Sequence, residues 1–343
     1  MVEFKWIIIL AFAKTSNKIT SSWFKIRFLR RLKLILGFKS SKFYFDRTKM
    51  TNTQRAYLEL HFAVFLWGFT AILGELIQLS SLSLVWWRVF LTSITILLTS
   101  KTWSNVRAMP RRLVLQYIGI GFIVVVHWLG FYGAVKLANA SVALICMATT
   151  SFFSSILEPL MLKSKVKWYE VALGLVIVPA MAFVADTLPS EMTLGLWVGL
   201  SSAFLVTVFS ILNKKLIDKS DPLSITFLEL GGGWMLLTLL MPLYFYFDKT
   251  AILIPPSVSD WFYLLVLSLL CTNLAYWLGI RTLRHLSAFA SNLTVNLEPV
   301  YGIVLAVVIL KENKELSPSF YIGAAVILAA VLSYPFLRNK FEK

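Results

Sequence analysis

Charged residues are scarce in this sequence. Only 15% of its 343 residues are Asp, Glu, Lys or Arg, whereas 58% are hydrophobic and the mean hydropathy is +0.76. A soluble domain is closer to half apolar and a quarter charged, because a chain of this length needs that much polar surface in water. The composition therefore predicts an integral membrane protein whose surroundings are a lipid bilayer.

Residues that build enzyme and metal sites are also few. The two cysteines, Cys146 and Cys271, stand alone in apolar segments, and the three histidines are His61, His127 and His285. No disulfide framework or metal-ligand spacing follows from them. His127 is the only deep histidine, and no nucleophile motif, zinc motif or phosphate-binding glycine loop accompanies it. We expect no metal, no cofactor and no catalytic residue, although a membrane-embedded enzyme stays as one alternative and a receptor or structural protein as another.

Long apolar runs dominate the chain after residue 57. Ten of them reach about 17 to 25 residues, the length of a transmembrane helix, and they are far too long for barrel strands. Short loops with proline separate them. The pattern predicts an all-α integral membrane fold with ten transmembrane helices, approximately at 60–79, 84–100, 113–135, 141–160, 168–185, 192–212, 223–247, 261–283, 287–310 and 319–337.

The net charge of +16 has a topological explanation. Lys and Arg lie in short loops and in the N-terminal tail, so we expect no nucleic acid partner. With a cytoplasmic N-terminus, the outer loops hold only Lys136, Lys249, Lys311 and Lys314. By the positive-inside rule both termini are cytoplasmic, in the inner (plasma) membrane. The inner loops and tail hold Lys101, Arg107, Arg111, Arg112, Lys163, Lys165, Lys167, Lys214, Lys215, Lys219, Arg281, Arg284, Arg338, Lys340 and Lys343.

The two ends of the chain lie outside the apolar runs. Residues 1–56 form a basic cytoplasmic extension, in which 21–38 could form an amphipathic helix on the inner leaflet. The alternative is that Met50 is the natural start and that residues 1–49 are not native. Residues 338–343 form a cytoplasmic tail.

An internal repeat relates the two halves, 57–190 and 191–337. In one register Arg88 falls opposite Glu229, and in a second Ser151 falls opposite Pro299. Each half holds five predicted helices, an odd number, so equivalent helices must run in opposite directions. Inverted-topology repeats are typical of transporters that alternate between inward-open and outward-open states.

The same segments resemble a known family, the EamA type of the drug/metabolite transporter superfamily. The resemblance covers roughly residues 57–337 and implies ten helices in two inverted five-helix repeats. It also implies export or exchange of small metabolites such as amino acids. Ser151 departs from the family pattern, where many members have proline, which leaves a kink of the fourth helix open. The matching pieces include "HFAVFLWGFTAILGELI" (61–77), "VWWRVFLTS" (85–93), "HWLGFYGAVKLANASVALICMATTSFFSSILEPL" (127–160) and "LCTNLAYWLGIRTLRHLSAFASNLTVNLEPVYGIVLAVVILKE" (270–312).

Ionisable residues inside apolar runs are the main candidates for a substrate site, since each costs at least roughly 2.5–3.5 kcal/mol at the membrane centre. Glu298 lies roughly 16 Å from the inner end of its helix and His127 roughly 21 Å, both near the midplane. Interhelical hydrogen bonding and aromatic packing are the alternative roles for the polar and aromatic candidates. The predicted cavity set is Glu298, His127, Asn273, Asn296, Trp67, Trp128, Tyr276 and Tyr301.

Arg88 and Glu229 are candidate gating or structural charges. Arg88 lies roughly 24 Å from the inner face and Glu229 roughly 9 Å. Alternatively, Arg88 extends outward to a lipid phosphate or to Glu75.

The sequence thus predicts a secondary transporter that exports or exchanges small polar or amphipathic metabolites by alternating access. A proton is a candidate coupling ion. It would compete with substrate at Glu298, and His127 is the best candidate partner of that carboxylate. The substrate, the direction of transport and the oligomeric state stay open.

Overall fold

The computed structural model describes residues 50–98, 100–185, 188–309 and 318–341. Every regular element within these ranges is a helix. The chain divides into two units at Met50, and the unit described below is Thr51–Lys343. The predicted amphipathic helix at 21–38 and the question of the start at Met50 therefore fall outside the described residues.

Helices occupy all ten predicted apolar runs. Polar side chains define where several of them begin: Thr51, Ser80, Asn139 and Ser287 each accept a hydrogen bond from a backbone N–H of the first turn. This satisfies donors that have no partner inside the helix. The first half holds α3 (Asn52–Leu76), α4 (Ser81–Leu97), α5 (Ser100–Ala108), α6 (Arg111–Leu137), α7 (Ala140–Met147), α8 (Thr150–Leu162) and α9 (Trp168–Ala185).

The second half has a similar order of long helices, without a counterpart of α5. After the short turn η1 (Ser190–Met192) come α10 (Thr193–Leu216), η2 (Ile217–Lys219), α11 (Pro222–Phe247) and α12 (Val258–Ser268). The helix then passes through a π-helical stretch, η3 (Leu269–Leu274), into α13 (Ala275–Thr282). The chain ends with α14 (Ala288–Val295), α15 (Glu298–Ile309) and α16 (Pro318–Phe341).

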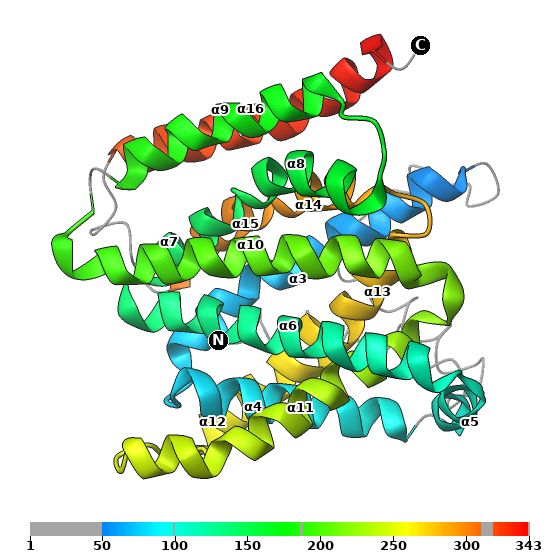
Figure 1. Cartoon of the computed structure of the whole chain (residues 1–343). Helices are drawn as coiled ribbons and strands as arrows, with labels where there is room; N and C mark the ends of the chain where they lie inside the picture. The colour runs from blue at the N-terminus through cyan, green and yellow to red at the C-terminus, as the bar shows by residue number, and fades with distance from the viewer. Residues whose placement is uncertain (1–49, 99, 186–187, 310–317, 342–343) are drawn as a thin grey trace, which may run out of the picture. The chain divides into compact units, whose positions relative to one another are not determined.

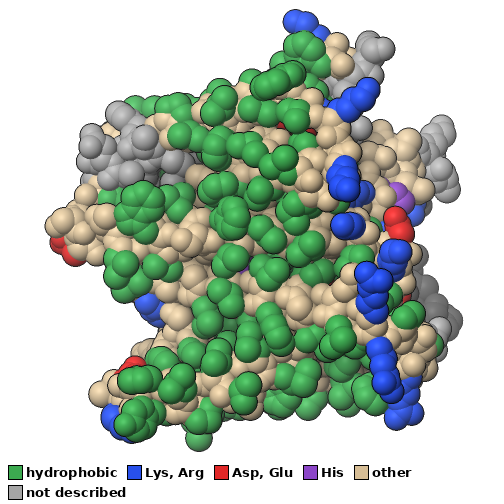
Figure 2. All heavy atoms as spheres, viewed as in Figure 1, with side chains coloured by type: hydrophobic (Ala, Val, Ile, Leu, Met, Phe, Trp, Pro, Cys, Tyr) green, Lys and Arg blue, Asp and Glu red, His purple; other side chains and the backbone are tan. Residues whose placement is uncertain are grey.

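Seven helical stretches of the described residues are long and apolar enough to cross a membrane, and α4 with α5 would make an eighth if that bent pair counts as one span. This confirms an all-α fold with many membrane spans. It does not reach the predicted ten, partly because the apolar stretch of α9 is shorter. Figure 2 shows apolar side chains over most of the visible face, with Lys and Arg gathered along one edge. We call this edge, where α10 ends at Lys214 and Lys215 and α6 begins at Arg111, the basic end.

The two halves have opposite directions and equivalent packing. α3 and α10, the first long helices of each half, run antiparallel (Figure 1). α10 packs on α6 and α8, and correspondingly α3 packs on α13 and α15; α11 packs on α6 as α4 packs on α12. Exchanging the halves thus converts each of these contacts into another observed one. The predicted two inverted repeats agree with this arrangement.

Both halves break their fourth helix at the same place. α7 ends at Met147 and α8 begins at Thr150, while α14 ends at Val295 and α15 begins at Glu298. In the register that sets Ser151 opposite Pro299, these breaks coincide. The first half therefore breaks without a proline at Ser151.

Side chains at the two breaks bond to each other and to the backbone. Asn296 donates to Ser151 Oγ at 2.9 Å and accepts from Thr150 Oγ1 at 3.1 Å. Thr149 donates to the carbonyl of Cys146 at 2.7 Å. Such side chains compete with the helical ladder and supply partners for the groups that the break frees. The paired breaks lie side by side at the centre of the bundle.

Candidate functional site

A cavity with about 100 Å³ of open volume lies between the two halves. It runs toward the basic end, because its wall includes Asn213, next to Lys214, and Leu283, next to Arg284. Both broken helices contribute to it, through Thr150 and Glu298. Its wall consists of Leu60, Trp67, Thr70, Arg88, His127, Trp128, Phe131, Met147, Thr150, Val206, Phe209, Ser210, Asn213, Tyr276, Gly279, Ile280, Leu283, Ser291, Asn292, Val295 and Glu298.

Arg88 lies on the cavity wall and is only 2% exposed. Its Nε donates to Thr272 Oγ1 at 2.6 Å, and its Nη1 donates to the hydroxyl of Tyr132 at 2.8 Å. The guanidinium also stacks on Trp128, 3.8 Å from the ring centroid. The alternative in which Arg88 extends outward to lipid or to Glu75 is therefore wrong.

The π-helical stretch η3 positions one partner of Arg88. Thr272 lies within it, and its hydroxyl donates to the carbonyl of Leu267, five residues earlier. A π-helical turn widens a helix locally and leaves carbonyls off the regular ladder. The widened turn brings the Thr272 oxygen to Arg88. Asn273, the next residue, is half-buried on the same stretch and is not on the cavity wall.

Glu298 is the first residue of α15 and lies on the cavity wall, 7% exposed. A helix N-terminus favours a negative charge, which stabilises a carboxylate there. Neither Glu298 nor Arg88 forms an ion pair with any residue in the described ranges. The wall thus carries a basic and an acidic side chain that form no ion pair within the described residues.

His127 is also on the wall but is held by another helix. Its Nδ1 lies 2.7 Å from Ser202 Oγ and 3.0 Å from the Ser202 carbonyl oxygen, and Ser202 in turn donates to the His127 carbonyl. These bonds join α6 to α10. His127 therefore has Ser202 as its hydrogen-bonding partner, and not Glu298 as the sequence suggested. Ser202 is fully buried away from the cavity, so this pair presents no nucleophile to a ligand.

Glu229 lies directly behind the wall. Its Oε2 accepts hydrogen bonds from Tyr276 at 2.5 Å and from Asn213 Nδ2 at 3.3 Å, and both of these residues line the cavity. Gly121 of α6 packs against the Glu229 backbone, where an added Cβ would collide with it. The close approach of α6 and α11 thus depends on this glycine and fixes the depth of the carboxylate.

Aromatic rings form much of the remaining wall. Trp128 and Tyr276 meet edge to face with centroids 6.1 Å apart, and Phe209 contacts both Tyr276 and His127. Such faces accept an apolar or aromatic group of a ligand without a polar partner. The site therefore combines two charges with a large apolar surface.

The structure sorts the predicted site residues into two groups. Glu298, His127, Trp67, Trp128 and Tyr276 line the cavity, together with Arg88. Asn296 instead bridges the two breaks, and Tyr301 packs edge to face on Phe65. Neither they nor Glu229 are on the wall.

Sequence reasoning missed several polar wall residues. Ser210 donates to Asn292 Oδ1 at 3.0 Å, and the Asn292 amide donates to Ser154 at 2.7 Å, which joins α10, α14 and α8. Thr150 could have been found, because it falls opposite Glu298 in the repeat alignment. The others are common polar residues in helices, and nothing in the sequence distinguishes them.

No group of three or more His, Cys, Asp or Glu side chains among the described residues could hold a metal ion. The arrangement can bind a small charged or polar molecule between two halves of opposite direction. Carriers built from inverted repeats bind their substrates at a comparable place, at the repeat interface beside broken helices.

Comparisons with known proteins agree with this. A solved structure described only as "Crystal structure of protein" is similar in fold, with a TM-score of 0.65 at 15% identity, over 84% of this chain and 99% of the other. No curated protein matches. The EamA-like transporter family matches residues 54–185 and 193–335, one match in each half. The chain therefore belongs to the EamA-like transporter family, membrane transporters of the drug/metabolite type.

Proposed function

We propose that this protein is a secondary carrier for small zwitterionic metabolites of amino acid type, and that it exports or exchanges them. The observation that carries this proposal is the pair of cavity charges without ion-pair partners, Arg88 and Glu298. Charges in a membrane interior are costly, so they are retained where a ligand or a partner uses them.

A zwitterion fits this pair of charges. Arg88 presents the donors of a guanidinium, which suit a carboxylate, while Glu298 accepts from an ammonium group. The side chain of the ligand would lie against Trp128, Tyr276 and Phe209. A ligand that carries both charges neutralises both residues at once, whereas an amine or a carboxylate alone leaves one of them unpaired.

The inverted halves support a rocking mechanism about this cavity. The breaks at Ala148–Thr149 and Asn296–Leu297 let each half bend beside the ligand. The basic end, with Lys214 and Lys215, supports one orientation in the plasma membrane. In it, the basic end and both termini lie in the cytoplasm. The cavity would then extend toward the cytoplasm.

Counterflow exchange in proteoliposomes tests the proposal with three probes of one shape. L-phenylalanine carries both charges, phenylethylamine lacks the carboxylate and 3-phenylpropionate lacks the ammonium group. We expect exchange of phenylalanine at least about tenfold above the other two, the ratio for roughly 1.4 kcal/mol of lost pairing. Equal exchange of the amine, or no exchange of any amino acid in a mixed panel, would contradict a zwitterion site.

Matched variants assign the two charges. Glu298→Gln keeps the shape and removes the anion, so its preference should shift toward 3-phenylpropionate. Arg88→Gln should shift the preference toward phenylethylamine. Arg107→Gln is the control, since Arg107 is an exposed residue of α5 outside the cavity. Variants that lose all three probes in parallel would indicate a structural role instead.

A further inference from the structure

Glu229, Tyr276 and Asn213 form a buried cluster that has fewer hydrogen-bond donors than acceptors. Glu229 is fully buried, and both bonds that it accepts, from Tyr276 and Asn213, go to the same oxygen, Oε2. Its other oxygen, Oε1, and the Asn213 amide oxygen are buried with no hydrogen-bond partner among the described residues. A buried acceptor without a donor costs about 1–3 kcal/mol, more for a charged group. Two such atoms in one cluster call for a bound species that supplies what is missing.

No cation of the surrounding helices supplies it. The titratable neighbours are Tyr276 on α13 and Tyr117 on α6, and the Tyr117 hydroxyl donates to the carbonyl of Leu216. On α4 the nearest charge is Arg88, whose guanidinium bonds to Thr272 and Tyr132. Within the described residues Glu229 forms no ion pair.

We propose that Glu229 is the proton-binding site of the carrier, a site distinct from the substrate charges in the cavity. A proton on Oε1 neutralises the buried carboxylate, and it turns an orphaned acceptor into a donor that the Asn213 amide oxygen can accept. A neutral ligand would not remove the charge. The proposal rests on the proposed transport function, which it extends to the source of energy.

Glu298 has a different environment. Its carboxylate lies on the cavity wall, where water or substrate can reach it, and its oxygens are not among the buried atoms without a partner. Glu298 is therefore open to a ligand in the cavity, whereas Glu229 is not on the cavity wall. In place of the competition between proton and substrate at Glu298, expected from the sequence, the proposed proton site would give two carboxylates with separate ligands.

Tyr276 connects the proton site to the cavity. Its hydroxyl donates to Glu229 and its side chain lines the cavity wall. The hydroxyl can pass its own proton to Glu229 Oε2, the oxygen that it contacts, as it takes another from water or substrate in the cavity, so that the tyrosine is unchanged and the carboxylate becomes a carboxylic acid. Rotation of the carboxylic acid group by half a turn then brings the protonated oxygen to the Oε1 position. Because Tyr276 also touches the ligand space, an occupied cavity would alter this transfer. That contact is a physical link between proton and substrate.

Infrared difference spectroscopy of the full chain in lipid tests the site without any substrate. Titration of the wild-type protein should show the C=O band of a buried carboxylic acid, which disappears as the pH rises. The part of this band that Glu229 gives should be absent in Glu229→Gln and retained in Glu298→Gln. A band that is the same in Glu229→Gln as in the wild type, or that does not change with pH, overturns the proposal. A retained circular dichroism spectrum checks that the Gln variant is folded.

Transport assays then separate this site from the proposed function. With the membrane potential clamped, a gradient of one pH unit at one proton per substrate drives about tenfold accumulation of phenylalanine in the wild type. Glu229→Gln should lose this accumulation and keep counterflow exchange within about twofold of the wild type. Accumulation that follows a Na⁺ gradient, or that survives in Glu229→Gln, overturns the proton site. Absence of exchange in the wild type contradicts the proposed function, and the infrared result is independent of it.

Discussion

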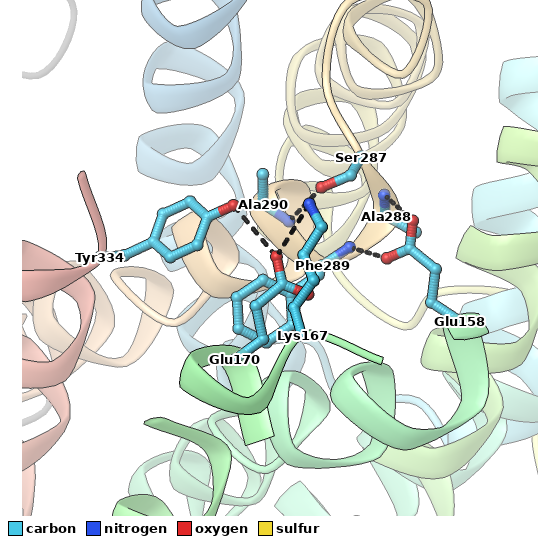
Figure 3. Close-up of polar contacts among 8 residues, drawn as sticks. All are labelled: Glu158, Lys167, Glu170, Ser287, Ala288, Phe289, Ala290 and Tyr334. Carbon is cyan, nitrogen blue, oxygen red and sulfur yellow. Dashed lines mark hydrogen bonds and ion pairs between the residues drawn. The ribbon is translucent and has the colours of Figure 1, made fainter. Parts of the chain in front are cut away.

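The carboxylate of Glu158, near the end of α8, accepts hydrogen bonds from the backbone N–H groups of Phe289 and Ala288 in the first turn of α14 (Figure 3). It thereby ties the first half of the protein to the second at the basic end. At the opposite end, the carboxylate of Asp260 accepts a bond from the N–H of Gln78 at 3.0 Å. Rocking of the halves about the central cavity would separate one of these contacts while it keeps the other.

Removal of the Glu158 carboxylate should therefore lower the stability of the fold. Glu158→Ala loses two bonds to a helix N-terminus and a charge that favours it, which we expect to lower the free energy of unfolding by about 1–2 kcal/mol. Thermal unfolding in detergent measures this. Glu191→Ala is the control, because Glu191 is exposed in η1. An equal effect of both substitutions would show that the contact contributes no stability.

A positive charge alone at position 88 should not support normal exchange. Arg88→Lys keeps a cation, but an ammonium group lacks the planar fork with which the guanidinium donates to Thr272 and Tyr132 while its face lies on Trp128. We expect phenylalanine exchange to fall at least about tenfold, the effect of losing roughly 1.4 kcal/mol of positioning. Arg107→Lys, which changes an exposed arginine over Trp103, should leave exchange unaffected. Normal exchange by Arg88→Lys would show that only its charge matters.

The two ends of the bundle should react from opposite sides of the membrane. Cysteine introduced at exposed Ser164, after α8, should label from the cytoplasm, and cysteine at exposed Thr250, after α11, from outside. The native Cys146 and Cys271 are buried, so the wild type should give little background. Labelling of both positions from one side would contradict the inverted arrangement of the halves.

Low pH should destabilise the N-terminus of α11. Asp221 caps this helix and lies between the membrane spans. Burial alone would raise the pKa of its carboxyl, but hydrogen bonds from Ser224 and Asn105 outweigh burial and lower the pKa below its usual value. A lowered pKa stabilises the fold above the ordinary Asp value, about 3.9, and this contribution is lost as the pH falls through the lowered value.

Asp221→Asn checks this sign. Asn can still cap the helix, so we expect the substitution to cost only the charge at the helix N-terminus, about 0.3–1 kcal/mol near neutral pH, and less in acid, where the wild-type carboxyl is protonated. Thermal unfolding of both proteins across the acidic range measures the difference. A gap that widens toward low pH would mean that the carboxylate is not the stabilising form.

Much of the fold follows from the sequence because it depends on local composition. Apolar runs of spanning length predict helices wherever they occur, and the repeat register placed Ser151 opposite Pro299, where the two helix breaks indeed coincide. The cause of the first break could not be read there, because no proline marks it. It comes from contacts across the interface, in which Asn296 bonds to Thr150 and Ser151.

The sequence by itself determined the class of protein, the positions of the helices and the inverted halves. It also predicted a depth for each ionisable residue, since rise per residue converts position along a helix into depth. Only the tertiary structure decided which polar groups meet. Depth carries no information on the direction in which a helix face points or on which neighbour it packs against. His127 and Glu298 lie at similar predicted depths, yet His127 bonds to Ser202, Arg88 turns to the cavity and Glu229 is enclosed behind Tyr276.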